Sequence, residues 1–150
     1  MKLWGNPSQR PAREVQPRYR ETPTTFKAHI LVVEDNPDVL SATEDFLSEK
    51  GYKVTTATSV AEAVERVKIS PEPDLLITDY HLANKETGKQ VIAAVREVRG
   101  QSFKAVVITG DTSAAVHAFD GDACLCWLRK PIDPRSLVTV LDSFLARSDG

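Results

Sequence analysis

Four of the five short apolar runs in this 150-residue chain end at residue types that could together handle a phosphoryl group. Glu34 and Asp35 follow the first run, Asp79 the third, Thr109 closes the fourth and Lys130 follows the fifth. Carboxylates gathered at one sheet edge repel one another, and Mg²⁺ with oxygen ligands relieves that repulsion. A lysine and a hydroxyl suit an incoming phosphoryl group. The set therefore predicts a Mg²⁺-dependent site where a carboxylate accepts phosphate.

Each of these residues also has an ordinary structural explanation when it is taken alone. A lone Asp after a strand is usually a helix cap or turn residue, and a lone Lys is usually a solvated charge. The prediction rests on the combination of an acid pair, a single Asp, a hydroxyl residue and a Lys-Pro pair in this order at four strand ends.

The elements that must position these side chains follow from the apolar spacing. Runs of aliphatic and β-branched residues alternate with segments whose apolar residues recur every three or four positions, which is typical of βα repetition. Such a chain predicts an α/β fold, a doubly wound five-stranded parallel sheet that binds ligands at the carboxyl ends of its strands. The predicted strands are residues 30–33, 53–57, 75–78, 105–109 and 124–128.

Capping residues and apolar spacing predict five helices. Asn36 caps the first, with Pro37 at its first position and Gly51 after its end, and Ser59 caps the second. A short helix is expected over residues 113–119. The predicted core-facing residues of the other helices are Val39, Leu40, Thr43, Phe46 and Leu47; Val60, Ala63, Val64 and Val67; Val91, Ile92, Val95 and Val98; and, after Pro134, Leu137, Val140, Leu141, Phe144 and Leu145.

With these motifs the sequence resembles the receiver domains of two-component response regulators, over roughly residues 28–147. The resemblance implies a flavodoxin-like sheet of strand order 2-1-3-4-5. Among receivers, those attached to hybrid sensor histidine kinases are the most similar. The matching segments are ILVVEDN at 30–36, DLLITDYHL at 74–82, VITG at 107–110 and LRKP at 128–131.

The resemblance implies a phosphorelay function and a role for each residue around the acceptor. Asp79 would accept a phosphoryl group from a histidine kinase, and Lys130 would pair with that group. Thr109 and Trp127 would form the switch, with Thr109 moving to hydrogen-bond a phosphoryl oxygen and Trp127 following it inward. The Lys130–Pro131 peptide bond is expected to be cis.

The resemblance also implies Mg²⁺ as the cofactor. Asp35, Asp79 and the backbone carbonyl of His81 would bind the ion directly, and Glu34 would bind it through water. The His81 side chain is expected to border the reaction centre and to tune autodephosphorylation. The chain departs from the family at Ala83, where a proline is usual, and in a loop to Gly88 that is one residue longer.

Composition divides the chain into three parts. Residues 1–27 hold four prolines and six basic against two acidic residues, and their net charge of +4 predicts a flexible basic extension. Residues 28–147 form the expected receiver domain, and residues 148–150 a disordered tail. The remainder of the chain carries a net charge of −6, so we expect no direct DNA binding. No apolar run is long enough for a membrane span.

The expected partners are a histidine kinase or a histidine phosphotransfer protein, and a downstream protein that contacts the fourth helix, fifth strand and fifth helix. The chain is not expected to be an enzyme beyond its own phosphorylation and dephosphorylation. Cys124 and Cys126 lie one residue apart, at the outer limit of disulfide geometry, and are predicted to be buried thiols of a cytoplasmic protein, with a metal or redox pair as the alternative.

Three other functions compete with this interpretation. A phosphatase of the haloacid dehalogenase type also uses a strand-end Asp, Mg²⁺ and a Lys, but it needs a second Asp where this chain has His81. A flavodoxin-like nucleotide or flavin carrier would need a Ser-, Thr- or Gly-rich loop after the first strand. A pseudo-receiver that binds partners without phosphorylation remains open, although such domains usually lack one of the acidic or lysine residues present here.

Overall fold

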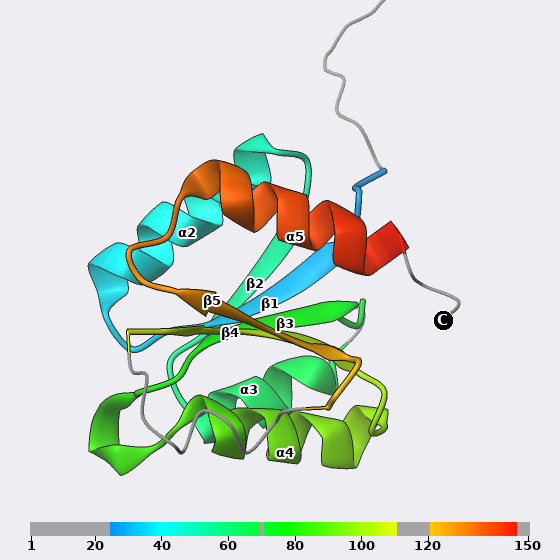
Figure 1. Ribbon diagram of the computed structural model, residues 1–150. Coiled ribbons are helices and arrows are strands. Elements are labelled where there is room, and N and C mark those ends of the chain that lie inside the picture. The colour runs from blue at the N-terminus through cyan, green and yellow to red at the C-terminus, as the bar shows by residue number, and fades with distance from the viewer. Residues whose placement is uncertain (1–24, 70, 111–120, 147–150) are drawn as a thin grey trace, which may run out of the picture.

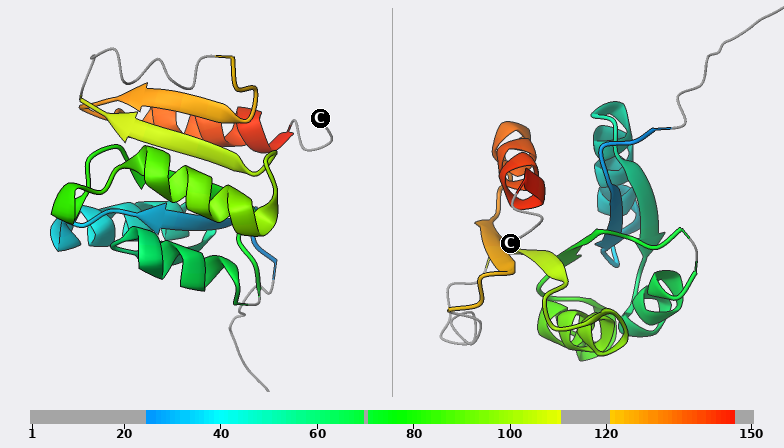
Figure 2. Two further views of the ribbon diagram at one scale, coloured as in Figure 1. Left: turned by 90° about the horizontal axis from the view of Figure 1, so that it is seen from below. Right: turned by 90° about the vertical axis from the view of Figure 1, so that its right-hand side faces the viewer.

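The computed structural model describes residues 25–69, 71–110 and 121–146, and within them one parallel sheet lies between two layers of helices. The strands β1 to β5 run in the order β2-β1-β3-β4-β5. Helices α2 and α5 cover one face, and α3 and α4 cover the other (Figures 1 and 2). The elements are β1 (His29–Val33), α2 (Pro37–Glu49), β2 (Lys53–Ala57), α3 (Val60–Val67), β3 (Leu75–Asp79), η2 (Ala83–Lys85), α4 (Gly88–Arg99), β4 (Lys104–Thr109), β5 (Leu125–Arg129) and α5 (Pro134–Ala146).

The core consists of two apolar layers, one on each side of the sheet. Successive side chains of a strand point to opposite faces, so Leu31 and Leu76 pack toward α3 and α4, whereas Val32 and Ile77 pack toward α2 and α5. All four side chains are at most 2% exposed. Burial on both faces explains why β1 and β3 are apolar without alternation.

The structure confirms the predicted strands to within one residue at either end and the predicted strand order. Four of the five expected helices are present in the described ranges, whereas the helix expected over residues 113–119 lies outside them. So do residues 1–24 of the expected extension and the tail at 148–150. Lys27, the last residue assigned to the extension, donates its backbone N–H to the Gly51 carbonyl at 2.9 Å.

The predicted caps are confirmed, because the Asn36 side chain accepts the N–H groups of Asp38 and Val39, and Gly51 has a φ of 97°. Two predicted core positions are wrong. Val39 is 46% exposed because it lies at the mouth of a cavity, and Val98 is 40% exposed.

Val98 faces solvent because Val95 and Arg96 take the buried positions at that end of α4. Cys124 and Cys126 are half-buried thiols rather than the fully buried ones expected. They lie at and beside the edge strand β5, which has a neighbour on one side only among the described strands. Within the described ranges, no helix combines the length and apolarity that a bilayer crossing requires.

A buried arginine holds α4 to the beginnings of β4 and β5. Arg96 is 7% exposed, and its Nη1 lies 2.6 Å from Asp122 Oδ2. Its Nε donates to the Phe103 carbonyl and its Nη2 to the Cys124 carbonyl, each at 3.1 Å. The hydrogen bond from Arg96 holds the pKa of Asp122 below its usual value. Each of these partners would lose a charged donor if Arg96 were removed.

We therefore expect Arg96→Met to lower the free energy of unfolding by about 3 kcal/mol, because it removes the charged donor from the Asp122 carboxylate and from two carbonyls. The matched control is Arg99→Met on the same helix, whose guanidinium group lies 3.4 Å from Glu72, a 57% exposed side chain, and donates to the Pro73 carbonyl. That substitution should cost less than about 1 kcal/mol. Urea denaturation measures both values, and equal losses would contradict the role assigned to Arg96.

His29 is a buried titratable group at the start of β1. Its side chain is enclosed, with Nε2 2.7 Å from Thr55 Oγ1, and its backbone N–H donates to Asp74 Oδ2 at 2.9 Å. Burial lowers the pKa of the imidazole below its usual 6.5. The neutral ring is therefore the form that the fold accommodates.

This burial predicts a pH-dependent stability. Below about pH 6.5 the unfolded chain binds a proton at His29 that the folded protein resists, so protonation favours unfolding. The unfolding free energy of the wild type should therefore fall relative to that of His29→Gln as the pH is lowered from about 7.5 to about 5.5. Thr55→Val removes the hydrogen bond but keeps the imidazole, so it should retain the slope. Denaturation curves with a pH-independent gap between wild type and His29→Gln would refute the assignment.

Candidate functional site

The strand register brings the predicted site residues to one edge of the sheet. Val33 of β1 pairs with Thr78 of β3, so Glu34 and Asp79 leave their strands at the same level. Asp79 in turn lies opposite Ile108 of β4, one residue before Thr109. The parallel pairing of β3, β4 and β5 thus places the acid pair, the single Asp, the hydroxyl and the lysine side by side.

Three carboxylates meet at this edge. One oxygen from each of Glu34, Asp35 and Asp79 lies within 4.8 Å of the others. Glu34 is 8% exposed, and its Oε2 accepts the backbone N–H of Asn36 at 3.0 Å. Burial raises the pKa of Glu34, the Asn36 N–H opposes that shift, and the neighbouring charge of Asp79 raises the pKa further. The cluster therefore holds negative charge against both burial and repulsion.

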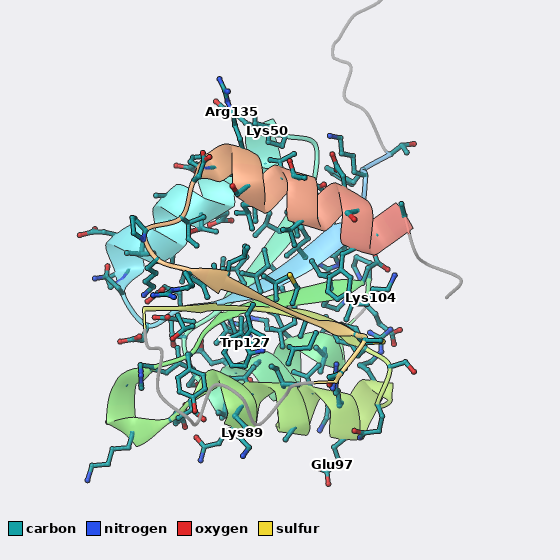
Figure 3. The ribbon with its side chains drawn as sticks, viewed as in Figure 1. Lys50, Lys89, Glu97, Lys104, Trp127 and Arg135 are labelled. Carbon is teal, nitrogen blue, oxygen red and sulfur yellow. The ribbon has the colours of Figure 1, made fainter. Side chains whose placement is uncertain are left out.

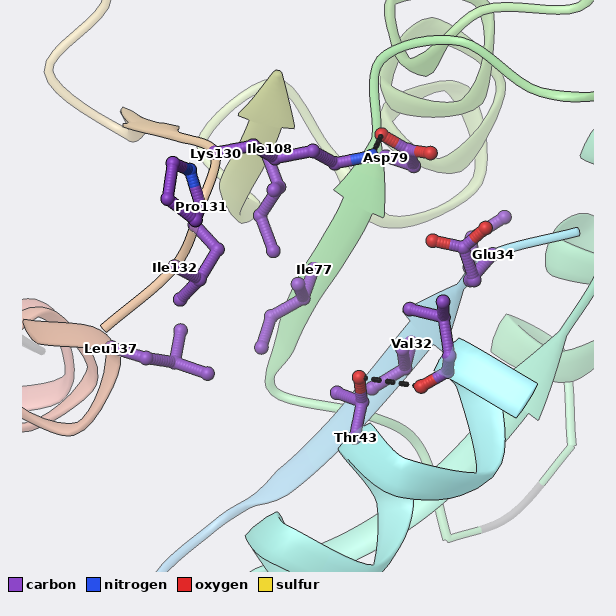
Figure 4. A pocket seen from close by; sticks show the side chains of 12 residues that line it. Val32, Glu34, Thr43, Ile77, Asp79, Ile108, Lys130, Pro131, Ile132 and Leu137 are labelled. Atoms are coloured by element: carbon purple, nitrogen blue, oxygen red, sulfur yellow. Dashed lines mark hydrogen bonds and ion pairs between the residues drawn. The ribbon is translucent and has the colours of Figure 1, made fainter. Parts of the chain in front are cut away.

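Lys130 supplies the opposing charge. Its Nζ lies 3.1 Å from Asp79 Oδ1, an ion pair that Figure 4 shows spanning from the end of β5 to the end of β3. The backbone N–H of Lys130 donates to the Thr109 carbonyl at 2.9 Å, and the Lys130–Pro131 peptide bond is cis as expected. The Thr109 side chain is 3% exposed at the end of β4, between the strands that carry the acid and the lysine.

The donor set fits a hard divalent cation. Carboxylate oxygens are the ligands that Mg²⁺ prefers, and Mg²⁺ usually keeps several waters, so two or three protein carboxylates are sufficient. A cation among Glu34, Asp35 and Asp79 would relieve the repulsion that raises the Glu34 pKa. The backbone carbonyl of His81 as a further ligand stays a prediction.

An aromatic cluster borders the acceptor. Tyr80, which follows Asp79, is 6% exposed, and its ring centroid lies 6.0 Å from that of Trp127 and 4.8 Å from that of His81. Trp127 is half-buried against the apolar layer between the sheet and α4, as Figure 3 shows. The sequence singled out Trp127 and His81 but not Tyr80, whose only signal was a bulky aromatic directly after the predicted acceptor.

The loop after β3 is fastened at several points. Gly88 donates its N–H to the Tyr80 carbonyl at 2.7 Å, and a Cβ at this position would lie 2.8 Å from the Asp79 carbonyl, so only glycine fits. Glu86 Oε1 accepts the N–H of Val60 at 2.9 Å and thereby ties the loop to the start of α3. Sequence reasoning missed Glu86 because the contact spans 26 positions and leaves no local pattern.

A CheY-like sheet with an acid cluster and a lysine at its carboxyl edge defines a class of protein, and comparisons with known proteins agree with it. The profile of the response regulator receiver domain matches residues 30–142, so the chain belongs to this family of two-component signalling domains. The two-component response regulator PprB of Pseudomonas aeruginosa is 25% identical over 85% of the chain. The chain spans 47% of that regulator.

Solved structures agree on the fold. A CheY-like receiver domain protein from Methanospirillum hungatei JF-1 superposes with a TM-score of 0.71 at 24% identity, covering 81% of this chain and 96% of that one. A sensor protein from Polaromonas sp. JS666 gives a TM-score of 0.70 at 27% identity, covering 81% of this chain and 98% of that one. The receiver assignment and the flavodoxin-like fold expected from the sequence are thus confirmed.

The raised pKa of Glu34 predicts the effect of neutralising it. Glu34→Gln should raise the free energy of unfolding at about pH 7 without Mg²⁺, because burial raises the pKa of Glu34 and the fold disfavours the ionised carboxyl. The gain should shrink as the pH falls toward 4.5, where the wild-type carboxyl takes up its proton in both states. The same variant should bind Mg²⁺ more weakly in calorimetric titrations. Asp38→Asn, at an exposed position, is the control, and unchanged Mg²⁺ affinity in Glu34→Gln would exclude the ligand role.

Proposed function

We propose that the chain is the phosphoacceptor of a two-component phosphorelay, with Asp79 as the residue that is phosphorylated. The observation that carries the proposal is the 3.1 Å pairing of Lys130 Nζ with Asp79 Oδ1 beside two further carboxylates. Of these three acids, Asp79 is the one that the lysine contacts, and its side chain is 11% exposed. A carboxylate so placed can meet a reactant while the positive charge of Lys130 is already in position.

The donor in this proposal is the phosphohistidine of a histidine kinase or of a histidine phosphotransfer protein. An Asp79 oxygen attacks phosphorus, the new O–P bond forms as the N–P bond breaks, and the leaving imidazole nitrogen keeps the electron pair and takes up a proton. Lys130 then exchanges its contact with Asp79 for a phosphoryl oxygen.

Mg²⁺ held by Glu34, Asp35 and Asp79 would supply charge neutralisation for the transferred oxygens. The three carboxylates position that charge, and the enclosure of Glu34 and Asp79 keeps bulk water from screening it. The chain would thus act on its own phosphorylation and dephosphorylation rather than on a separate substrate.

Switching follows from the arrangement around Thr109. A phosphoryl group on Asp79 adds acceptor oxygens within reach of the neighbouring strand end, and a movement of Thr109 toward them would open space beside Trp127. Because Trp127 packs on Tyr80, that movement would also change the acceptor loop. The surface that responds comprises β5 and α5, together with the segment 113–119 that lies outside the described residues, and a downstream protein would read it.

The competing functions receive less support from the site. A haloacid dehalogenase-type phosphatase needs a second Asp two residues after the nucleophile, and His81 occupies that position with its ring against Tyr80. A pseudo-receiver would lack part of the acid and lysine set, whereas Lys130 is paired with Asp79 here. His81 therefore counts against the phosphatase, and the pairing counts against the pseudo-receiver.

Asp79→Asn should abolish phosphorylation, because the amide oxygen is a far weaker nucleophile than the carboxylate. Incubation with a small acyl phosphate and Mg²⁺, followed by intact-mass measurement, should add one phosphoryl group to the wild type and none to the variant. Asp38→Asn, an exposed acid on α2, is the matched control and should react like the wild type. An adduct of equal yield on Asp79→Asn would place the acceptor elsewhere.

Trp127 should report the switch by its fluorescence. In a Trp4→Phe background, Trp127 is the only tryptophan, and addition of Mg²⁺ and beryllium fluoride, a phosphoryl mimic, should change its emission. Thr109→Val keeps the buried volume but removes the hydroxyl, so it should reduce that change while Asp79 still accepts phosphate. Identical emission in all states of a fully phosphorylated sample would show that Trp127 is static packing.

A further inference from the structure

A cavity of about 590 Å³ opens beside the acceptor site, on the face of the sheet covered by α2 and α5. Figure 4 shows its floor on β1, β3 and β4, one wall on α2 and the other on the segment from Pro131 to Leu137. The lining is mostly apolar. Its polar side chains other than Thr43 gather at one end and are Glu34, Asp79 and Lys130.

The cavity exists because the α2 wall is made of short side chains. Val39 and Thr43 stand one turn apart on α2, and both line the cavity. The Thr43 hydroxyl donates to the Val39 carbonyl at 2.8 Å, so this polar group is satisfied within the helix and does not need a partner in the cavity. Ile132 on the opposite wall is only half-buried, so neither wall fills the space between them.

The charge at the polar end selects the kind of ligand. Two carboxylates, Glu34 and Asp79, stand there against the single ammonium group of Lys130, which already lies 3.1 Å from Asp79. An anion entering from the apolar side would meet this excess of negative charge, and a neutral hydroxyl could donate a hydrogen bond but would bring no opposing charge. A cation would make charge-assisted hydrogen bonds to carboxylates that are almost enclosed by protein.

We propose that this cavity binds an apolar organic cation, a primary amine on an aliphatic or aromatic body, with its ammonium group at Glu34 and Asp79. The volume lies within the range of small-molecule sites, and an apolar lining with a few convergent polar groups is their usual composition. The ammonium group and Mg²⁺ need the same carboxylates, so the two exclude each other. This competition rests on the proposed function, and so does its consequence, that a bound amine lowers the rate of phosphorylation of Asp79.

The experiment compares three probes that share a phenylalkyl chain and differ in their polar group: phenylbutylamine, phenylbutanol and phenylbutyrate. Calorimetric or NMR titration of the full chain without Mg²⁺ should show saturable binding of the amine. The alcohol and the carboxylate should bind with an affinity lower by about tenfold or more. Adding Mg²⁺ should raise the apparent Kd of the amine. Failure of the amine to bind, or equal binding of phenylbutanol or phenylbutyrate, would overturn the proposal.

Variants locate the site. Thr43→Leu should fill the cavity and weaken amine binding about tenfold, whereas Thr139→Leu, on α5 outside the cavity, should leave it unchanged. If Thr43→Leu folds poorly, Val39→Phe serves instead, because this exposed position lies at the mouth of the cavity and the larger ring should narrow it and weaken amine binding. Val98→Phe, at an exposed position on α4, is its control. Equal effects of a variant and its control would overturn the assignment. Amine binding is measured without a phosphodonor. A failure of the amine to bind is therefore distinguishable from a failure of Asp79 to accept phosphate.

Discussion

The concentration of like charge at one sheet edge is the constraint on which the rest of the structure depends. Three carboxylates lie within 4.8 Å of one another, and one ammonium group opposes them. Such an arrangement survives only if the strands that carry it are held elsewhere. The two apolar layers provide that support, because β1 and β3 are buried on both faces directly below the charged residues. Apolar burial thus stabilises the sheet, and repulsion between the carboxylates destabilises its edge.

The same edge connects three environments that respond to charge. The ion pair of Lys130 with Asp79 faces the cavity, and the Thr109 carbonyl accepts the backbone N–H of Lys130. Tyr80, which follows Asp79 in the chain, packs its ring in the aromatic cluster. On the proposed function, a change of charge on Asp79 would act on a side-chain pair, a strand end and the packed ring of Tyr80, which belongs to the apolar layer facing α3 and α4.

The fold and the acid–lysine set could be predicted from the sequence because their signals are local. Apolar runs, caps and strand-end residues each lie within a few positions, and parallel pairing then dictates where they meet. What could not be predicted are contacts between distant segments, such as Glu86 with Val60 or Arg96 with Asp122. Val39 and Val98 fit the helical spacing of core residues but are exposed to solvent, and spacing alone cannot reveal how far the sheet extends under a helix.

Arg96 holds the start of β5, and pairing with β4 holds its end. The guanidinium group contacts the carbonyl of Cys124 and the carboxylate of Asp122 just before the strand begins. At the other end Arg129 pairs with Thr109, and the Lys130 N–H donates to the Thr109 carbonyl. On the proposed function, a shift of Lys130 would therefore be shared with the end of β4, while the start of β5 stays held by Arg96.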